Sequence, residues 1–524
     1  MSKARPDPET AQSTLAEEVE DVTEEQPLRT LSHESTDEDV EDFANTHELS
    51  DHYEVLQKAS TLLRCRGDHL RVLTLSDEEA AALSRETTHK WRQPKLLYFT
   101  IFICALGAIE QGWAQTAMNG ANLYLPEAMG IASDSSHDTF VLGLINCGIF
   151  VGQALLGVWL SDPINNRVGR RGAIVAASLL CLVGNIGSAI SPSWPVLVGF
   201  RLVLGTGLGL NSSTVNVYAA ECAPAYIRGG LAVSWQAFTA FESAAWLCKW
   251  DRYDKAYACL IRLRNTELQA AAEVYSTYVS SRRSSKLHGD ERRSTSKIWS
   301  LFRIARNRHA LYASYTVMFS QQACGINIIA FYSSTLFSSS GFSATAALWA
   351  SVVFGFINFI GAFPAVWAMD SLGRRSLLLW SLPAMAVTML LASLSFRLPE
   401  GTARFVTLAG LIYTFCALYS PGMGPVPCAY SAEVYPSNVR EVGMSFAIFT
   451  ASIWATVLSL TFPALLNGLG EQGTFTLYAL LNVLAWLLCW TFVRETKNMT
   501  LDEMDAVFQD SPPTFIKQRL GVAT

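Results

Sequence analysis

Ten apolar runs of membrane-spanning length constrain this chain of 524 residues more than any other feature of its sequence. A helix needs about 20 apolar residues to cross the hydrocarbon core of a bilayer. Because lipid offers backbone groups no hydrogen-bond partner, only helices and closed barrels can span it. The sequence therefore predicts an all-α, multi-pass membrane protein. The runs lie at 97–118, 139–160, 172–191, 195–220, 311–336, 344–368, 376–396, 404–430, 443–467 and 474–493.

The charge pattern indicates the same class of protein. Charged residues make up 16% of the chain, against about 25% in typical soluble domains. The net charge of -6 comes mostly from the first 60 residues, so it indicates no nucleic-acid partner. Residues 1–95 are polar and lack the apolar core of a signal peptide. They predict a disordered or loosely helical, acidic cytoplasmic tail.

Cysteines and catalytic motifs give no sign of an enzyme. The 11 cysteines stand singly, mostly inside apolar runs, and form no CxxC pair. They are typical of small apolar packing residues rather than of disulfides or metal ligands. No nucleophile–base set, metal cluster or phosphate loop is present in the sequence. We expect no catalysis and neither a bound metal nor a cofactor.

Basic residues between the runs orient the chain in the membrane. By the positive-inside rule, the side that carries them is cytoplasmic, together with both termini. Residues 243–309 are polar, carry about fourteen Lys and Arg, and predict a cytoplasmic helical linker. The loop residues that follow the second, fourth, sixth and eighth runs are Arg167, Arg170, Arg171, Arg228, Arg374, Arg375 and Arg440.

Two short motifs recur about 200 residues apart. Residues 162–171 have the sequence DPINNRVGRR, and residues 370–375 have DSLGRR. Residues 221–228 have ECAPAYIR, and residues 433–440 have EVYPSNVR. Each motif lies at the cytoplasmic end of a matching run, and the two follow in the same order. The chain therefore predicts two parallel half-domains.

Residues 319–332, with the sequence FSQQACGINIIAFY, are the candidate ligand site. Amides carry donors and acceptors without charge, so they suit a ligand made of neutral hydroxyls, such as a sugar. Gly325 allows the helix to break between the glutamines and Asn327, which would direct both sides toward one cavity. The alternative is that these amides only bond neighbouring helices.

On these motifs the chain resembles the sugar porter family of the major facilitator superfamily. The resemblance covers about residues 97–505 and also includes GFRLVLGTGLG at 199–209, GPVP at 424–427 and ETK at 495–497. The first run, with QGWAQTAMNGANL at 111–123, resembles a filamentous-fungal branch. The family implies twelve helices in two bundles, a central cavity and alternating access.

The helix count departs from that pattern. After residue 241 the chain goes directly to ESAAWL, which resembles the family's PESPRWL linker motif. Residues 229–241 would give roughly 18 Å of helix against a core of about 30 Å. We therefore expect a fold truncated to about 10–11 helices, lacking most of the fifth and the sixth. A skipped exon or mispredicted gene model explains this better than an evolved ten-helix carrier.

The resemblance also assigns residues to the substrate and to proton coupling. The family's first-helix Asp is replaced by Ala114, while the fourth-helix Arg201 is present, so Glu110 is a candidate substitute partner for Arg201. The alternative is an uncoupled facilitator. Cys428 stands where the family has a tenth-helix tryptophan. The expected substrate-binding residues are Gln236, Gln321, Gln322, Asn327, Asn358 and Trp454.

A cytoplasmic gate is expected from the repeated loop motifs. Arginines of each half would pair with nearby acids to hold the cytoplasmic side shut in one of two states. Topology anchoring is a second role for the same charges. The expected gate residues are Asp162, Arg170, Arg171, Glu221, Arg228, Asp370, Arg374, Arg375, Glu433 and Arg440.

These observations predict a carrier of a hexose or related polyol in the plasma membrane, with protons as a candidate second cargo and the lipid bilayer as its surroundings. An efflux carrier of the same superfamily is one rival, which Ala114 and Cys428 would permit. A non-transporting sugar sensor is another, favoured by the long amino-terminal tail. The expected domains are 1–95 (tail), 96–242 (incomplete amino-terminal bundle), 243–309 (linker), 310–494 (six-helix bundle) and 495–524 (cytoplasmic tail).

Overall fold

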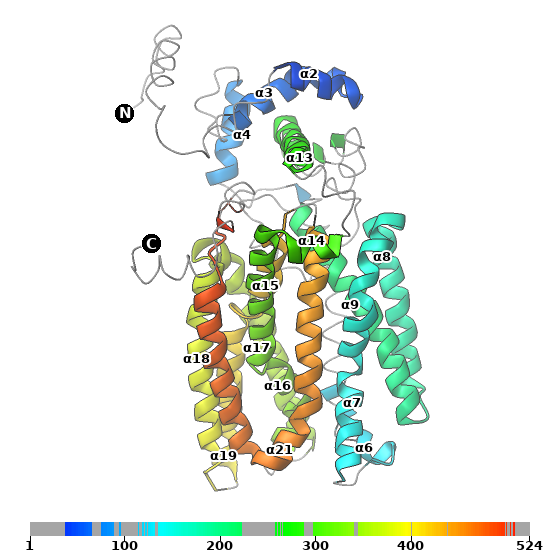
Figure 1. Ribbon diagram of the computed structural model, residues 1–524. Helices are drawn as coiled ribbons and strands as arrows, with labels where there is room; N and C mark the ends of the chain where they lie inside the picture. Colours follow the sequence, from blue (N-terminus) through cyan, green and yellow to red (C-terminus); the bar gives the residue numbers. More distant parts are fainter. Residues whose placement is uncertain are drawn as a thin grey trace, which may run out of the picture.

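The protein is seen in a computed structural model as bundles of long helices below a smaller group of helices (Figure 1). Six of the described helices are long and apolar enough to cross a membrane. The described residues are 37–64, 75–88, 94–95, 135–222, 266–287, 297–339, 344–399, 401–436 and 439–497, with parts of 114–131, 257–264 and 499–508.

The amino-terminal bundle consists of three long helical elements in its described part. These are α7 (Ser136–Gly152), α8 (Val158–Ala189) and α9 (Trp194–Cys222), with the π-helical turn η3 (Gln153–Gly157) joining α7 to α8. Helix α8 contains two helical segments that meet at Gly169, where φ is 74°. The second predicted run coincides with α7, η3 and the start of α8, and the third coincides with the segment of α8 after Gly169. The short helix α6 (Leu125–Ala128) precedes the bundle.

The carboxy-terminal bundle contains all six predicted runs of its half. The last helix, α21, is a pair of antiparallel arms that meet at Gly470, as the orange and red ribbons of Figure 1 show. Nine of the ten predicted runs thus coincide with described helices; most of 97–118 lies outside the described residues. The helices are α15 (Ala305–Ala323), α16 (Ile326–Ser339), α17 (Ala344–Ser371), α18 (Arg374–Ser395), α19 (Thr402–Tyr419), α20 (Val426–Val434) and α21 (Arg440–Phe492).

Close packing of α7 and η3 against α9 explains the glycine-rich stretch of residues 199–209. A Cβ on Gly205 would lie 2.0 Å from the carbonyl oxygen of Ile149, and one on Gly209 would lie 2.9 Å from the Cα of Gly157. Small residues of this kind let membrane helices approach backbone to backbone. The stretch therefore has a packing role.

The repeated loop motif adopts the same backbone conformation in both halves. Gly169 has φ 74° and ψ 175°, and Gly373 has φ 96° and ψ 160°. A positive φ is costly for residues that carry a Cβ. The arginine that follows each glycine, Arg170 or Arg374, is buried. The structure thus supports two related half-domains.

A second group of helices lies beyond one end of the bundles, at the top of Figure 1. It consists of α2 (Asp37–Thr46), α3 (Tyr53–Arg64) and α4 (Asp77–Thr88) from the amino-terminal segment and α13 (Glu267–Leu287) from the linker. Of the two states predicted for residues 1–95, disordered or loosely helical, these stretches are helical. Although this segment is acidic, α2 and α3 carry apolar residues that are buried against the linker helix α13. The short α14 (Lys297–Arg303) leads from the linker into α15.

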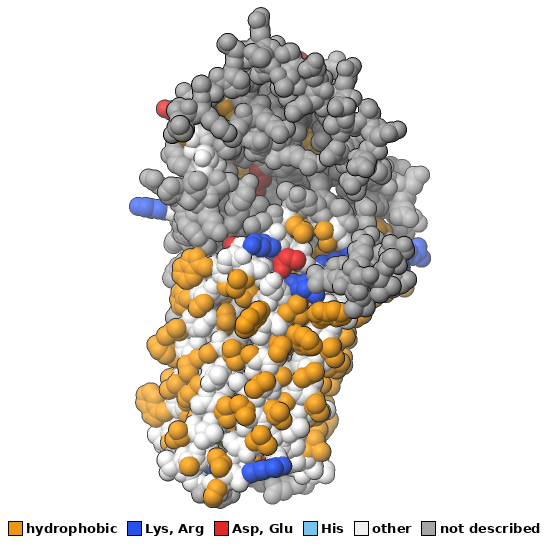
Figure 2. All heavy atoms as spheres, turned by 90° about the vertical axis from the view of Figure 1, so that its left-hand side faces the viewer, with side chains coloured by type: hydrophobic (Ala, Val, Ile, Leu, Met, Phe, Trp, Pro, Cys, Tyr) orange, Lys and Arg blue, Asp and Glu red, His pale blue; other side chains and the backbone are white. Residues whose placement is uncertain are grey.

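The surface supports a membrane location. Figure 2 shows hydrophobic side chains spread over the lower body of the molecule, with charged side chains gathered at the upper edge of this region. Large exposed side chains of α17 include Trp349, Phe356 and Trp367. Exposed apolar side chains over such a length are the expected lipid-facing surface of a spanning helix.

Candidate functional site: an amide row, a buried arginine and two seams between the bundles

The helix carrying the amides breaks at Gly325. Helix α15 ends at Ala323 and α16 begins at Ile326, while Gly325 has φ +92°. The break frees the carbonyl group of Cys324, which accepts a hydrogen bond from Asn482 Nδ2 at 3.1 Å. Asn482 is fully buried on the second arm of α21. The predicted break is confirmed, and Asn482 is a supporting residue that the sequence analysis missed.

The three predicted amides of this segment form a continuous hydrogen-bonded row. Gln321 Nε2 donates to the carbonyl oxygens of Met423 (3.1 Å) and Gly424 (3.0 Å). Gln322 Nε2 donates to Gln321 Oε1 at 3.4 Å. Asn327 Nδ2 donates to Gln322 Oε1 across the break. The amides therefore face protein rather than lipid.

The row leaves one polar atom unused at its end. Gln321 uses its amide nitrogen on the loop before α20, and the carbonyl groups of Gln321 and Gln322 each accept from the next amide. Within the described part of the chain, no donor reaches Asn327 Oδ1, and Asn327 is only half-buried. An acceptor fixed in this way suits a ligand hydroxyl.

The turn between α19 and α20 holds two of the predicted residues. Gln321 binds its carbonyl groups at residues 423 and 424. Asn358 of α17 accepts a hydrogen bond from Ser420 Oγ at 2.8 Å, at the start of the same turn. Gly424, the first residue of the GPVP motif, and the preceding Met423 thus provide the backbone acceptors that fix the amide row, a role that the side chains of the motif did not indicate.

Trp454 lies in an aromatic group. Its indole nitrogen donates to the hydroxyl group of Tyr315 at 3.2 Å. Its ring packs edge-on against Phe319, with centroids 4.8 Å apart, and Phe319 stacks with Tyr315 at 6.4 Å. Tyr315 is 40% exposed, so the group remains accessible. Gln236 and Glu110 lie outside the described residues.

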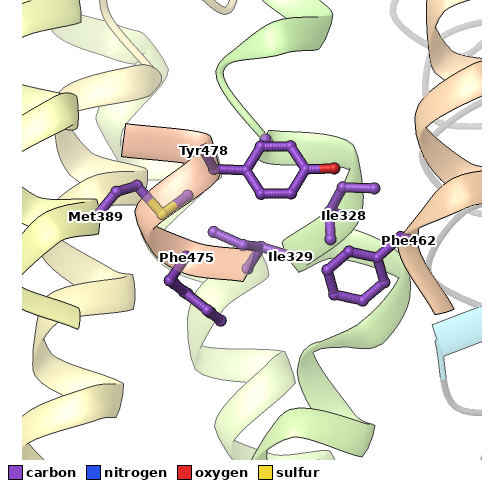
Figure 3. A pocket seen from close by; sticks show the side chains of 7 residues that line it. Ile328, Ile329, Met389, Phe462, Phe475 and Tyr478 are labelled. Atoms are coloured by element: carbon purple, nitrogen blue, oxygen red, sulfur yellow. The ribbon is translucent and has the colours of Figure 1, made fainter. Parts of the chain in front are cut away.

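A small pocket beside the break is apolar (Figure 3). Ile328 and Ile329 come from α16, Met389 from α18, Phe462 from the first arm of α21, and Phe475 and Tyr478 from its second arm. Gly325 completes the lining. Such a wall offers almost no hydrogen bonds, so this pocket is unsuited to a polyol. It is a packing gap behind α16.

Arg201 is a buried cation in the amino-terminal bundle. Its side chain is 3% exposed, and its Nε and Nη2 atoms have no hydrogen-bond partner among the described residues. The neighbouring helix α7 approaches closely, since a Cβ on Gly148 would lie 3.3 Å from Arg201 Cβ. An uncompensated buried guanidinium costs several kcal/mol. A nearby anion would therefore stabilise this guanidinium group.

At the end nearest the second group of helices, the two bundles are joined by an ion pair that the sequence analysis only half identified. Arg170 Nη2 of α8 lies 2.7 Å from Glu441 Oε1 of α21, and both side chains are buried. Ser161 and Ser445 add a hydrogen bond of 2.8 Å between the same helices. Glu441 was missed because the amino-terminal repeat has Gly229 at the matching position.

Several of the other predicted gate residues pair inside one bundle. Arg374 lies 2.8 Å from Glu433 and 3.3 Å from Asp370. Arg375 donates to the carbonyl oxygens of Val493 (2.8 Å) and Trp490 (2.9 Å). These contacts stabilise the carboxy-terminal bundle itself.

The remaining gate residues differ in their surroundings. Arg440 donates to the Tyr435 carbonyl oxygen within its own bundle at 3.3 Å. Arg171 is exposed, and Asp162 is half-buried on the same helix. Arg228 and the side chain of Glu221 lie outside the described residues.

The bundles also meet at their other end. Asn146 Nδ2 of α7 donates to the hydroxyl group of Tyr332 at 3.1 Å. Asn122 Nδ2 donates to the carbonyl oxygen of Phe331 at 3.0 Å. Both acceptors belong to α16, which follows the break at Gly325. The amide row therefore lies between these two contacts of the bundles, one at Arg170 and Glu441 and the other at Asn146 and Tyr332.

Solved structures of major facilitator proteins are similar to this arrangement. A structure of the proton:xylose symporter XylE bound to 6-bromo-6-deoxy-D-glucose has a TM-score of 0.69 and 22% identity, covering 79% of this chain and 99% of that one. A partially occluded inward-open structure of XylE from E. coli has a TM-score of 0.62 at 21% identity, covering 77% and 99%. The fold is therefore that of a major facilitator transporter.

Sequence comparison agrees. The myo-inositol transporter FST1 of Gibberella moniliformis is 27% identical over 80% of this chain and 79% of its own length. The galactose-proton symporter of Escherichia coli K12 is 26% identical over 78% and 94%. The family model described as "Sugar (and other) transporter" matches residues 100–241 and 238–508. The chain therefore belongs to the family of sugar and other transporters.

Proposed function

We propose that this chain carries a hexose or a related polyol across the plasma membrane by alternating access, with both termini in the cytoplasm. The amide row from Gln321 to Asn327 is the observation that carries the proposal. Its members are neutral, held by one another and, at Gln321, by backbone carbonyl groups, and lie between two bundles that meet at both ends. Fixed amides favour ligands with matching hydroxyls, because an analogue lacking one leaves an amide unpaired.

Uptake of radiolabelled hexoses, pentoses and cyclitols by yeast without its own hexose carriers tests this proposal. We expect saturable uptake, and Asn327→Ala should lower kcat/KM by roughly tenfold or more, the effect of losing one buried hydrogen bond. Thr414→Val is the matched control, since Thr414 is an exposed residue bonded only within its own helix. Net export would support an efflux carrier instead. Growth signalling without flux would support a sensor.

We infer that Glu110 supplies the partner that Arg201 lacks in the described part of the chain and takes part in proton coupling. The support is the burial of Arg201 together with its two unbonded nitrogen atoms. Glu110→Gln should remove the dependence of uptake on the proton gradient while facilitated exchange continues. If the variant keeps its full gradient dependence, Glu110 has no coupling role and the chain is coupled elsewhere or not at all.

The shortened amino-terminal bundle is proposed to reflect missing coding sequence. Its support is that the two family matches meet at residues 238–241, beside the junction where the fifth and sixth helices would be expected. Sequencing the transcript across residues 241–242 tests this. A transcript with about two further helices would establish the omission, whereas an uninterrupted match to this sequence would establish a shortened carrier.

A further inference from the structure

The cytoplasmic helices share a hydrophobic core that joins segments about 200 residues apart in the sequence. Phe43 of α2 and Leu56 of α3 are buried, as are Val274 and Tyr275 of α13. The Phe43 ring packs edge-on against Tyr275, with centroids 5.6 Å apart, and lies 4.4 Å from the Tyr278 ring. No residue of this core belongs to the described cores of the bundles. It is therefore a separate packing unit.

Polar contacts at the rim fix how the two segments meet. His52 Nδ1 lies 2.8 Å from Glu267 Oε1 at the start of α13. Tyr257 donates from its hydroxyl group to the same carboxylate at 2.9 Å, and its ring packs against His52 at 4.7 Å. Burial, together with the hydrogen bond to Glu267, raises the pKa of Tyr257 well above its ordinary value. The hydroxyl group therefore remains a donor at physiological pH.

Helix α4 is attached to the same unit. Ser76 and Glu79 form a reciprocal capping box, in which the Ser76 backbone N–H donates to Glu79 Oε2 at 2.8 Å and the Glu79 N–H donates to Ser76 Oγ at 3.2 Å. Lys58 of α3 lies 3.1 Å from Glu79. Leu75 is buried in the shared core. All three amino-terminal helices thus depend on one another.

The amino-terminal helices need the linker in order to be stable. They contain 10, 12 and 12 residues, and isolated helices shorter than about 12–15 residues are marginal in water. Helix α2 is also strongly acidic, with the sequence DEDVEDFANT. The apolar face of α13 provides the burial that these helices lack by themselves. The stability of α2, α3 and α4 is therefore tied to their contact with α13.

The linker is the covalent connection between the two bundles. In sequence, α13 lies between α9, the last described helix of one bundle, and α14, which leads into α15 of the other. Figure 1 shows α13 below α2 and α3 and above the cytoplasmic ends of the bundles. When α13 is packed against α2 and α3, the linker has less freedom to extend as the ends of the two bundles move apart. A free linker would follow it at little cost.

We propose that the amino-terminal segment Asp37–Thr88 is an intramolecular ligand of linker helix α13, and that its docking restrains opening of the cytoplasmic seam at Arg170 and Glu441. The proposal rests on the proposed alternating access for its second part. Docking favours the closed seam to the extent that the segment binds α13 more tightly when the seam is closed than when it is open. Release of the segment would increase how often the carrier opens to the cytoplasm.

Hydrogen exchange of the full-length protein in lipid nanodiscs, followed by mass spectrometry, tests both parts. Leu56→Asp places a charge in the shared core, and Gln57→Asp adds the same charge at the adjacent half-exposed position as the matched control. In Leu56→Asp we expect exchange within Glu267–Leu287 to rise roughly tenfold or more, because local opening of α13 loses its packing. Exchange around residues 440–449 should rise about two- to fivefold as the seam opens more often. Gln57→Asp should change neither.

Exchange in α18 serves as the measure of an intact bundle. If α13 keeps its protection in Leu56→Asp while α18 is unchanged, the segment does not hold the linker and the proposal is wrong. If α13 loses protection but residues 440–449 do not respond, docking has no effect on the seam and the proposal is also overturned. Both exchange measurements are made without substrate. A negative result is therefore distinguishable from a failure of the proposed sugar transport.

Discussion

At the scale of single residues, Gly325 has the clearest structural requirement. It combines φ +92° with a close approach, since an added Cβ would lie 3.0 Å from Tyr478 Cδ1 and 3.3 Å from Met389 Cε. A residue with a side chain is strained at such a φ, at a cost of about 1–3 kcal/mol. The amide row depends on this bend, because Asn327 reaches Gln322 across it.

Gly325→Ala should therefore lower the apparent melting temperature in detergent and reduce substrate affinity together. Gly355→Ala is the matched control, since Gly355 lies in helix α17 with no heavy atom within 4 Å of an added Cβ. That substitution should be neutral or slightly stabilising because alanine favours a helix. Equal melting temperatures for the two variants would show that the bend tolerates a side chain.

The residues of the amide row could be predicted because polar side chains beside a glycine stand out in an apolar run. Their partners could not. Gln321 binds carbonyl groups that any residue would supply, and Asn482 is a lone amide on a distant helix. Glu441 likewise escaped the repeat comparison, because its partner Arg170 belongs to the other half of the chain.

At the scale of elements, Glu495 caps the start of α18 from a position 120 residues away. Its Oε1 accepts from the backbone N–H of Arg374 at 2.8 Å, and its Oε2 from that of Arg375 at 3.1 Å. A carboxylate at a helix N-terminus satisfies free N–H groups and interacts favourably with the helix dipole. The ETK motif therefore fastens the end of α21 to the loop of the repeated motif.

Glu495→Ala should destabilise the carboxy-terminal bundle by about 1–2 kcal/mol, the usual cost of losing a helix cap. Glu495→Gln, which keeps one acceptor but no charge, should have a smaller effect. Hydrogen exchange in the first turn of α18 and thermal unfolding in detergent measure both. A first turn equally protected in all three proteins would contradict the capping role.

Spanning helices were the most predictable elements, since their length and hydropathy are set by the bilayer. The packing of α2, α3 and α4 against α13 could not be predicted in this way. Helix α2 has no basic residue, and its apolar positions Val40, Phe43 and Ala44 are too few to indicate a core within one segment. Their burial becomes evident only when the linker is placed beside them.

At the scale of the whole molecule, the Arg170–Glu441 pair is an ionic contact between the two bundles. Removing one partner leaves the other buried charge uncompensated in the closed arrangement. Glu441→Gln should therefore favour the conformation open to the cytoplasm. The exchanged pair Arg170→Glu with Glu441→Arg should restore part of the closure.

Spin labels on cysteines at Arg167 and Leu372, exposed residues of the two bundles, can report this opening as a longer distance. Glu433→Gln is the control, because Glu433 pairs with Arg374 inside one bundle. It should destabilise that bundle without lengthening the distance. An unchanged distance distribution in Glu441→Gln would show that the pair does not hold the seam.

The packing of the amino-terminal helices on α13 also has a consequence for biosynthesis. Roughly 180 residues separate Thr88 from Glu267. At about 5–20 residues per second, the ribosome needs about 10–40 s to supply the partner helix. During this time the acidic segment has emerged without its complement, while the first bundle is inserting into the bilayer. We expect the negative charge of this segment to keep it soluble until α13 has been synthesised. This role is separate from its proposed role in the folded carrier.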